Sequence, residues 1–163
     1  MRTWTVAIGL CIFLFFIPLQ CFILGDGLGM GAQGAVFRYQ VTSFGTSLIP
    51  ITYEMGYITS GLYTGETALS GILWALGTFI LVCITIFSLV SWNSITHPSL
   101  RFIVIGIACA CIFYLASCVA QYGPSFYGTA GISLPCGVII LAIFAVFLHT
   151  YPDTFFEKNS PRS

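Results

Sequence analysis

The chain has 163 residues, of which 58% are hydrophobic and 6% are charged, and its formal net charge is zero. A soluble domain carries about 25% charged residues, so this chain has too few charges to cover a water-facing surface. The composition therefore excludes a soluble enzyme and a disordered chain. No basic run is present to hold phosphates, so we expect no nucleic-acid partner. The length suits one domain, residues 1–163, whose main solvent is lipid.

Four apolar runs divide the chain, and none of them contains Asp, Glu, Lys or Arg. They cover about residues 4–24, 69–92, 102–122 and 132–151. Each has the length of about 20 residues that a membrane-spanning helix needs, and helices satisfy their backbone groups within the segment. The predicted fold class is therefore an all-α integral membrane protein, a bundle of four transmembrane helices.

The basic residues predict how this bundle is oriented. Arg2, Arg101, Lys158 and Arg162 would share one side of the membrane, and Arg38 alone would lie on the other. Because basic residues favour the cytoplasmic side, we expect a multi-pass protein of the cell membrane with both termini cytoplasmic. The outer side then carries three acids against one base.

The outer loop, residues 25–68, is predicted to hold a β-hairpin over residues 36–55. Apolar and polar residues alternate over 36–44 and again over 49–55, which is typical of half-buried strands, and Gly45 suits the turn. A three-residue turn at 45–47 would place Arg38 opposite Glu54 and Tyr39 opposite Tyr53. The candidate interaction residues of this loop are Asp26, Arg38, Tyr39, Tyr53, Glu54 and Glu66.

Small residues and cysteines mark the apolar runs. Gly106 and Ala110 form a small-xxx-small pair that predicts close helix packing, either within the bundle or between copies. The seven cysteines lie in or at the ends of apolar runs, which favours a packing role. A pair of Cys21 with Cys118 or Cys136 stays open. No residue set suggests catalysis, a metal or a cofactor.

Three functions are compatible with these features. The first is a non-enzymatic tetraspan protein that acts through protein–protein contacts, as an accessory or assembly subunit or as a cell-surface structural protein, with membrane lipid, other membrane proteins or a second copy as partners. The second is an oligomeric channel or transporter for a small neutral or lipid-like solute. The third is an outer-face lipid-modifying enzyme, with Asp26, Glu54 and Glu66 as its acids and Arg38 as its anion binder.

The expected layout is similar in topology to that of claudins. Residues 61–63 read Gly-Leu-Tyr where that family has Gly-Leu-Trp, and the outer loop lacks the two cysteines of the family. The family is therefore not assigned.

Overall fold

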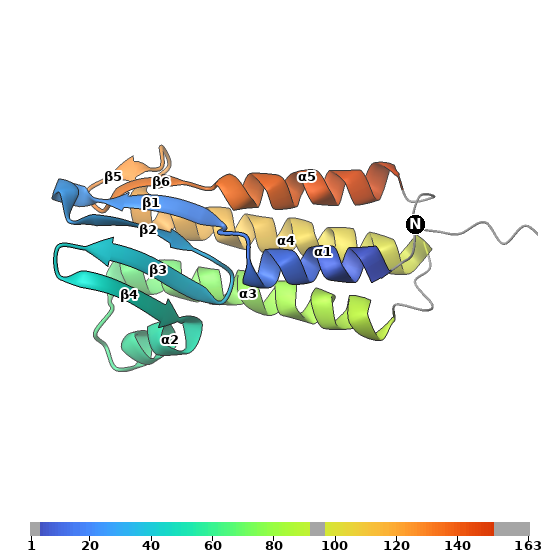
Figure 1. Ribbon diagram of the computed structural model, residues 1–163, viewed down its shortest axis with the longest axis horizontal. Helices are drawn as coiled ribbons and strands as arrows, with labels where there is room; N and C mark the ends of the chain where they lie inside the picture. The colour runs from blue at the N-terminus through green and yellow to red at the C-terminus, as the bar shows by residue number, and fades with distance from the viewer. Residues whose placement is uncertain (1–3, 92–96, 152–163) are drawn as a thin grey trace, which may run out of the picture.

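In the computed structural model, residues 4–91 and 97–151 are described, and they form helices that lie side by side with an antiparallel sheet at one end (Figure 1). The elements in chain order are α1 (Trp4–Phe15), β1 (Gln20–Leu24), η1 (Gly25–Gly27), β2 (Gly29–Gln33), β3 (Phe37–Thr42), β4 (Gly45–Pro50), α2 (Ile51–Thr59), α3 (Gly65–Val90), α4 (His97–Tyr122), β5 (Tyr127–Gly128), β6 (Gly131–Leu134) and α5 (Cys136–Thr150).

The sheet corrects the predicted fold class. Its six strands are all antiparallel and lie in the order β4-β3-β2-β1-β6-β5. The prediction of an all-α bundle of four transmembrane helices is therefore wrong, because the described chain combines five α-helices with this sheet. Strand β1 is central, and it joins the strands of the first loop to β6, which lies more than 100 residues later.

Two helices, α3 and α4, are long and apolar enough to cross a membrane. Each has 26 residues, a length of about 39 Å at 1.5 Å per residue. Helices α1 and α5 have 12 and 15 residues, fewer than the ~20 that a span needs. Among the residues that the structure describes, only the predicted spans 69–92 and 102–122 are therefore found as long apolar helices, and the tetraspan prediction fails at 4–24 and 132–151.

Proline explains both failures. Pro18 follows the end of α1, and Pro135 separates β6 from α5. A proline disfavours the α conformation in the residue before it, so neither apolar run continues as one helix. The apolar residues on the far side of Pro18 join the sheet as β1, where strands on both sides satisfy the backbone groups.

The predicted hairpin has the wrong register and the wrong second strand. Strands β3 and β4 do pair, but Arg38 is opposite Ile49 and Tyr39 is opposite Leu48. The hydroxyl of Thr42 donates to the carbonyl of Gly45 at 3.1 Å, which supports a tighter turn than the one predicted. After Pro50 the chain turns into α2, so the strand expected to reach residue 55 is a helix.

The core lies between the helices and the inner side of the sheet. Gly106 of α4 lies against Ile84 of α3, where a Cβ would collide with the isoleucine side chain, and Ala110 is fully buried. Gly77 of α3 allows the ring of Tyr114 to approach in the same way. Small residues thus let α3 and α4 lie close together.

Candidate functional site

The pairing register gives the two faces of the sheet opposite character. On the inner face, Gln20, Gln33 and Arg38 stand opposite one another across β1, β2 and β3, and all three are buried. On the outer face, Cys21, Ala32, Tyr39 and Leu48 form one row, and a second row consists of Tyr127, Ile132, Ile23, Met30, Val41 and Thr46. A sheet that faces water normally shows the reverse, with polar residues outward.

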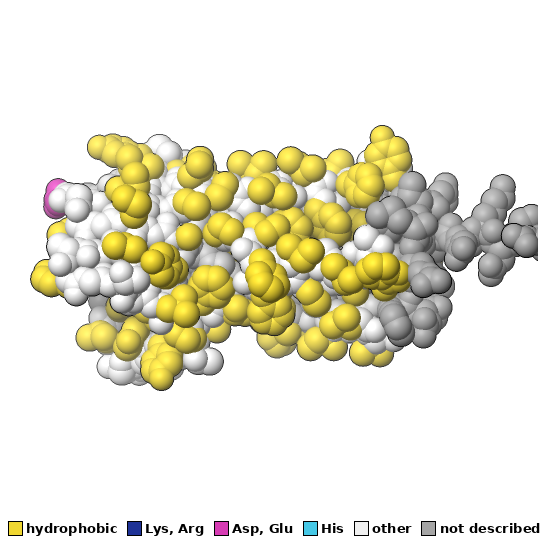
Figure 2. All heavy atoms as spheres, in the orientation of Figure 1, with side chains coloured by type: hydrophobic (Ala, Val, Ile, Leu, Met, Phe, Trp, Pro, Cys, Tyr) yellow, Lys and Arg dark blue, Asp and Glu magenta, His cyan; other side chains and the backbone are white. Residues whose placement is uncertain are grey.

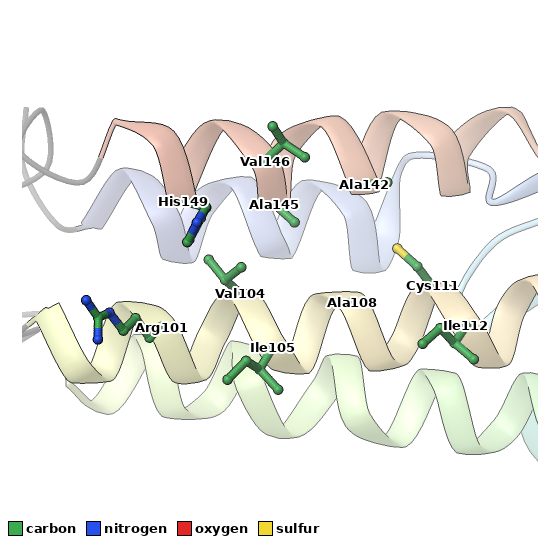
Figure 3. A pocket seen from close by; sticks show the side chains of 10 residues that line it. All are labelled: Arg101, Val104, Ile105, Ala108, Cys111, Ile112, Ala142, Ala145, Val146 and His149. Carbon is green, nitrogen blue, oxygen red and sulfur yellow. The ribbon is translucent and has the colours of Figure 1, made fainter.

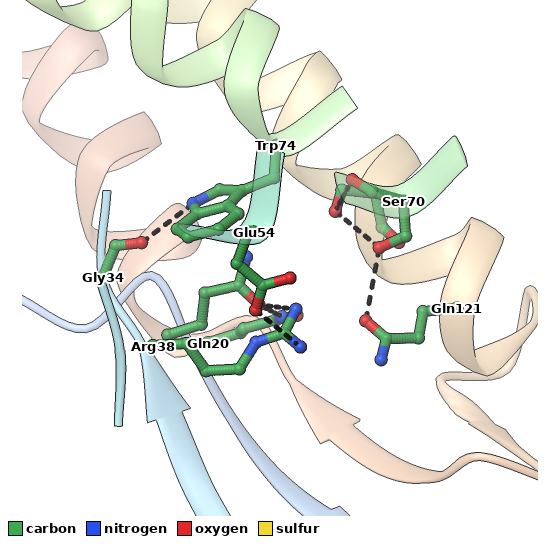
Figure 4. Close-up of polar contacts among 9 residues, drawn as sticks. Gln20, Gly34, Arg38, Glu54, Ser70, Trp74 and Gln121 are labelled. Carbon is green, nitrogen blue, oxygen red and sulfur yellow. Dashed lines mark hydrogen bonds and ion pairs between the residues drawn. The ribbon is translucent and has the colours of Figure 1, made fainter. Parts of the chain in front are cut away.

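The inner row is the centre of a buried polar cluster, which consists of Gln20, Gln33, Arg38, Glu54, Cys118 and Ser133. Figure 4 shows Gln20, Arg38 and Glu54 of this cluster. Gln20 donates from Nε2 to Oε1 of Gln33 at 2.6 Å. Its own Oε1 accepts from the thiol of Cys118 at 2.6 Å and from the hydroxyl of Ser133 at 3.0 Å. The cluster thus connects β1, β2 and β6 with α4.

Arg38 and Glu54 form the charged part of the cluster. Nη1 of Arg38 lies 3.1 Å from Oε1 of Glu54, and Nη2 donates to Oε1 of Gln33 at 3.1 Å. The guanidinium group lies 5.9 Å from the ring centres of Phe22 and Trp74, a distance at which cation–π attraction acts. Glu54 reaches this position from α2 and is 1% exposed.

This ion pair is not fully satisfied. Among the described residues, Nε of Arg38 and Oε1 of Glu54 have no hydrogen-bond partner of good geometry. Burial raises the pKa of the Glu54 carboxyl above its ordinary value, and the nearby Arg38 charge only partly opposes that rise. Burial thus favours the neutral form of this carboxyl, while the charge of Arg38 favours the ionised form.

The space at the cluster is too small for a substrate. The cavity lined by Gln20, Gln33 and Ser117 has a volume of about 10 Å³, which is about the room that one water molecule takes. Small-molecule sites usually have 300–1,000 Å³. The polar cluster is therefore a closed structural contact between sheet and helices.

Further hydrogen bonds fasten the sheet to α3. The indole Nε1 of Trp74 donates to the carbonyl of Gly34 at 2.9 Å, and the hydroxyl of Thr78 donates to the carbonyl of Ala35 at 2.6 Å. Both carbonyls belong to the connection between β2 and β3. At the sheet end, α3 and α4 are linked by two serines. The hydroxyl of Ser70 donates to the backbone carbonyl of Ser117 at 3.0 Å, and the hydroxyl of Ser117 donates to the backbone carbonyl of Ser70 at 2.8 Å.

The outer sheet face is open and apolar. We use this name for its eight large side chains, each 41% to 68% exposed: Ile23, Met30, Tyr39, Val41, Leu48, Tyr127, Ile132 and Leu134. A groove of about 500 Å³ is lined by six of them, all except Leu48 and Tyr127. In the view of Figure 2, hydrophobic side chains are dense over the helices and stand among other surface at the sheet end, and an acidic side chain is seen only at the tip of that end. Contiguous apolar patches of this kind mark interaction sites.

A second groove lies between α4 and α5 at the end of the molecule away from the sheet (Figure 3). It has a volume of about 730 Å³, and small residues such as Ala108, Ala142 and Ala145 leave this room between the helices. Arg101 and His149 line the groove at its outermost end, while the rest of the lining is apolar apart from a thiol.

The structure separates most of the predicted interaction residues. Asp26 lies on η1 with a positive φ of 57° and is exposed, and Glu66 is exposed in the first turn of α3. Tyr53 is 62% exposed on α2, whereas Tyr39 belongs to the outer sheet face. Within residues 4–91 and 97–151, no three His, Cys, Asp or Glu side chains gather in a group that suits a metal ion.

Sequence reasoning missed most of both sheet faces. The residues it assigned to membrane helices include Gln20, Ile23 and Ser133, which the structure places in strands. Pro18 and Pro135 were the available signals, since each interrupts an apolar run next to residues with strand propensity.

Comparison of the chain with protein-family models, with curated proteins and with solved structures returns no match. The fold and the sites therefore define the class by themselves: a protein with two helices able to cross a membrane and a sheet whose outer face is apolar.

Proposed function

We propose that this chain is a non-enzymatic membrane protein that acts by protein–protein contact through the outer sheet face. One observation carries the proposal. The sheet turns its glutamines and Arg38 toward the helices and two rows of apolar side chains outward. Since exposure of these rows to water is unfavourable by about 25 cal/mol per Å², a partner that covers them gains most of that free energy.

In the proposed arrangement α3 and α4 cross the membrane, and the sheet lies on its outer side. The start of α1, the end of α3, the start of α4 and the end of α5 lie together at the end of the molecule opposite the sheet (Figure 1). Arg101 belongs to that end, and Arg2 adjoins it in the sequence. Basic residues favour the cytoplasmic side, so both chain ends are assigned to the cytoplasm and the protein is multi-pass.

The partner that we propose is a second copy of the chain. The described outer sheet face carries no charged side chain, so it offers no electrostatic pattern that would select a different protein. Two such faces fit each other as two apolar sheets do in a sandwich, about 10 Å apart. A two-fold axis through the contact would bury the same patch on both copies, which closes the assembly as a dimer.

The test is the oligomeric state of the full chain in detergent and in lipid nanodiscs, measured by light scattering. We expect a dimer, and we expect Met30→Glu to convert it to a monomer, because a carboxylate would be buried in the contact. Tyr53→Glu is the matched control: Tyr53 is 62% exposed and Met30 is 63% exposed, but Tyr53 lies on α2.

A wild-type monomer in both environments contradicts the proposal, and so does a dimer that Met30→Glu leaves intact. If the chain is purified with a different protein bound at the outer sheet face, a function by protein–protein contact is supported, but the proposal that the partner is a second copy is overturned.

The groove between α4 and α5 favours a second candidate function, the binding of an anionic lipid. Its apolar walls suit an acyl chain, and Arg101 and His149 stand where a phosphate headgroup would lie. Basic pockets between membrane helices bind such headgroups. Vesicles containing a fluorescent anionic phospholipid test this: Arg101→Ala should weaken transfer of the lipid to the protein, and an unchanged affinity would refute the site.

A further inference from the structure

Cys21 and Cys136 are 115 residues apart in the chain, and their sulfur atoms lie 3.7 Å from each other. Cys21 lies on β1 opposite Leu134 of β6, and Cys136 follows two residues later as the first residue of α5. We propose that these two cysteines are a covalent cross-linking site, a disulfide that ties the central strand of the sheet to the start of α5.

The backbone around the pair holds the two sulfurs together. The backbone N–H groups of Gly137 and Val138 both donate to the carbonyl of Leu19, at 3.0 and 3.2 Å. A Cβ on Gly137 would collide with the carbonyl of Pro18, so the start of α5 touches the chain just before β1. The sulfurs need to move from 3.7 Å to about 2.05 Å, a change that side-chain rotation provides.

The other five cysteines do not compete for either partner. The thiol of Cys118, which the sequence also allowed as a partner of Cys21, donates to Gln20 in the buried polar cluster. Cys111 is buried and directed at the carbonyl of Val138. In the described chain, which includes all seven cysteines, no other two sulfur atoms are in contact.

In the single chain, before two copies associate, Cys21 and Cys136 are also accessible to an oxidant. Cys21 is exposed, and Cys136 is half-buried. Burial and the neighbouring Cys136 raise the pKa of the Cys21 thiol, so little of it is the reactive thiolate at neutral pH. This suits a bond that forms slowly and persists, and it does not suit a rapid redox catalyst.

The oxidant is a disulfide, such as glutathione disulfide or the active-site disulfide of a thiol oxidase. The thiolate of one cysteine attacks a sulfur of this oxidant, and one oxidant thiol leaves. The thiolate of the other cysteine then attacks the protein sulfur of the mixed disulfide and displaces the second oxidant thiol. Two electrons pass from the cysteines to the oxidant, and the two thiol protons end on its two released thiols.

In the cell, the bond rests on the proposed function in one respect: the sheet end must lie on the oxidising side of the membrane. The experiment uses membranes that contain the full chain, alkylated before lysis, followed by proteolysis and mass spectrometry without reductant. We expect one linked peptide pair that contains Cys21 and Cys136 and lacks two hydrogen atoms. Cys21→Ser and Cys136→Ser should each abolish it, and Cys83→Ser, at an exposed cysteine of α3, should not.

Alkylation of both thiols in these membranes overturns the proposal, and so does a link between two chains through Cys21. Treatment of the purified chain with glutathione disulfide then shows which premise failed. If Cys21 and Cys136 join there, the assigned orientation is wrong; if they stay apart, the geometry of the pair is wrong. The oligomeric state is measured on the reduced protein, so it fails or succeeds independently.

Discussion

The buried ion pair between Arg38 and Glu54 gives the sharpest test of how the sheet is held on the helices. Replacing Arg38 with Met removes the cation that pairs with Glu54, which is 1% exposed. Breaking a buried pair on one side costs about 3–5 kcal/mol, because an uncompensated charge stays buried. Glu54→Leu should cost about 3 kcal/mol, at the lower end of that range, since Arg38 keeps its hydrogen bond to Gln33 and its two aromatic rings.

The double variant Arg38→Met, Glu54→Leu should be far less harmful than the two losses added together. It leaves no buried charge, and buried ion pairs replaced by apolar residues are often neutral or stabilising. The double variant still loses the charged hydrogen bond to Gln33, worth about 1.5–3 kcal/mol, and the cation–π contacts, about 0.5–1 kcal/mol each. These losses are offset because the two charged groups no longer have to be removed from water on folding. We expect a net loss of about 2 kcal/mol or less.

The assay is equilibrium unfolding of the purified chain in mixed micelles with increasing SDS, followed by circular dichroism. The single losses sum to about 6–8 kcal/mol and the double variant should lose about 2 kcal/mol or less, so the cycle should show a coupling of at least about 4 kcal/mol. Additivity within about 0.5 kcal/mol would refute the buried pair. Tyr53→Leu, on the exposed side of α2, is the control and should change stability by less than about 0.5 kcal/mol.

Two further predictions concern pH and backbone contact. Because the folded chain raises the pKa of Glu54 above its ordinary value of 4.5, the folded state binds this proton more tightly than the unfolded state. The contribution of Glu54 to the free energy of unfolding is therefore fully present below pH 4.5 and is lost as pH rises through the raised pKa. Glu54→Gln should remove this dependence of stability on pH. A wild type that becomes more stable than this variant as pH rises over the same range would contradict the prediction. Gly137→Ala should destabilise the chain by about 1–3 kcal/mol, because its Cβ would meet the backbone of Pro18 and Leu19. The control Gly56→Ala places a Cβ where nothing lies within 4 Å, and it should be neutral or stabilising by up to about 1 kcal/mol. Thermal unfolding measures both variants, and equal losses of stability would refute the prediction.

The two long helices were predictable because nothing interrupts them. The runs 69–92 and 102–122 contain neither proline nor a charged residue, and the structure has α3 and α4 at Gly65–Val90 and His97–Tyr122. The runs 4–24 and 132–151 have the same hydropathy but contain Pro18 and Pro135. A short apolar segment beside a proline is compatible with a buried strand as well as with a helix. Whether it becomes a strand or a helix depends on pairing with strands that are far away in the sequence.

The contact of Arg38 with Glu54 could be predicted, but not its geometry. The sequence predicted this pair from a hairpin register in which Arg38 is opposite Glu54, but in the structure Arg38 is opposite Ile49 and Glu54 reaches it from α2. Residues 49–55 show a period of two, yet Ile51, Glu54, Met55 and Ile58 also fit one helix face, and Ile58 of α2 does lie against Gly71 of α3. Over seven residues the two periods are not distinguishable, and only packing against α3 decides between them.

The polar inner row and the apolar outer row are two consequences of one pairing register. Gln20, Gln33 and Arg38 stand opposite one another, so their hydrogen bonds form only when β1, β2 and β3 are aligned as observed. A slip of one residue would turn this row outward and direct Tyr39 at the helices. An apolar inner row would bind the helices nearly as well in either alignment, whereas the polar row penalises the slipped one by leaving buried groups unpaired. We therefore infer that the buried polar cluster selects the alignment that presents the outer sheet face. Arg38→Met should then weaken the proposed contact between two copies, even though Arg38 lies on the opposite face of the sheet.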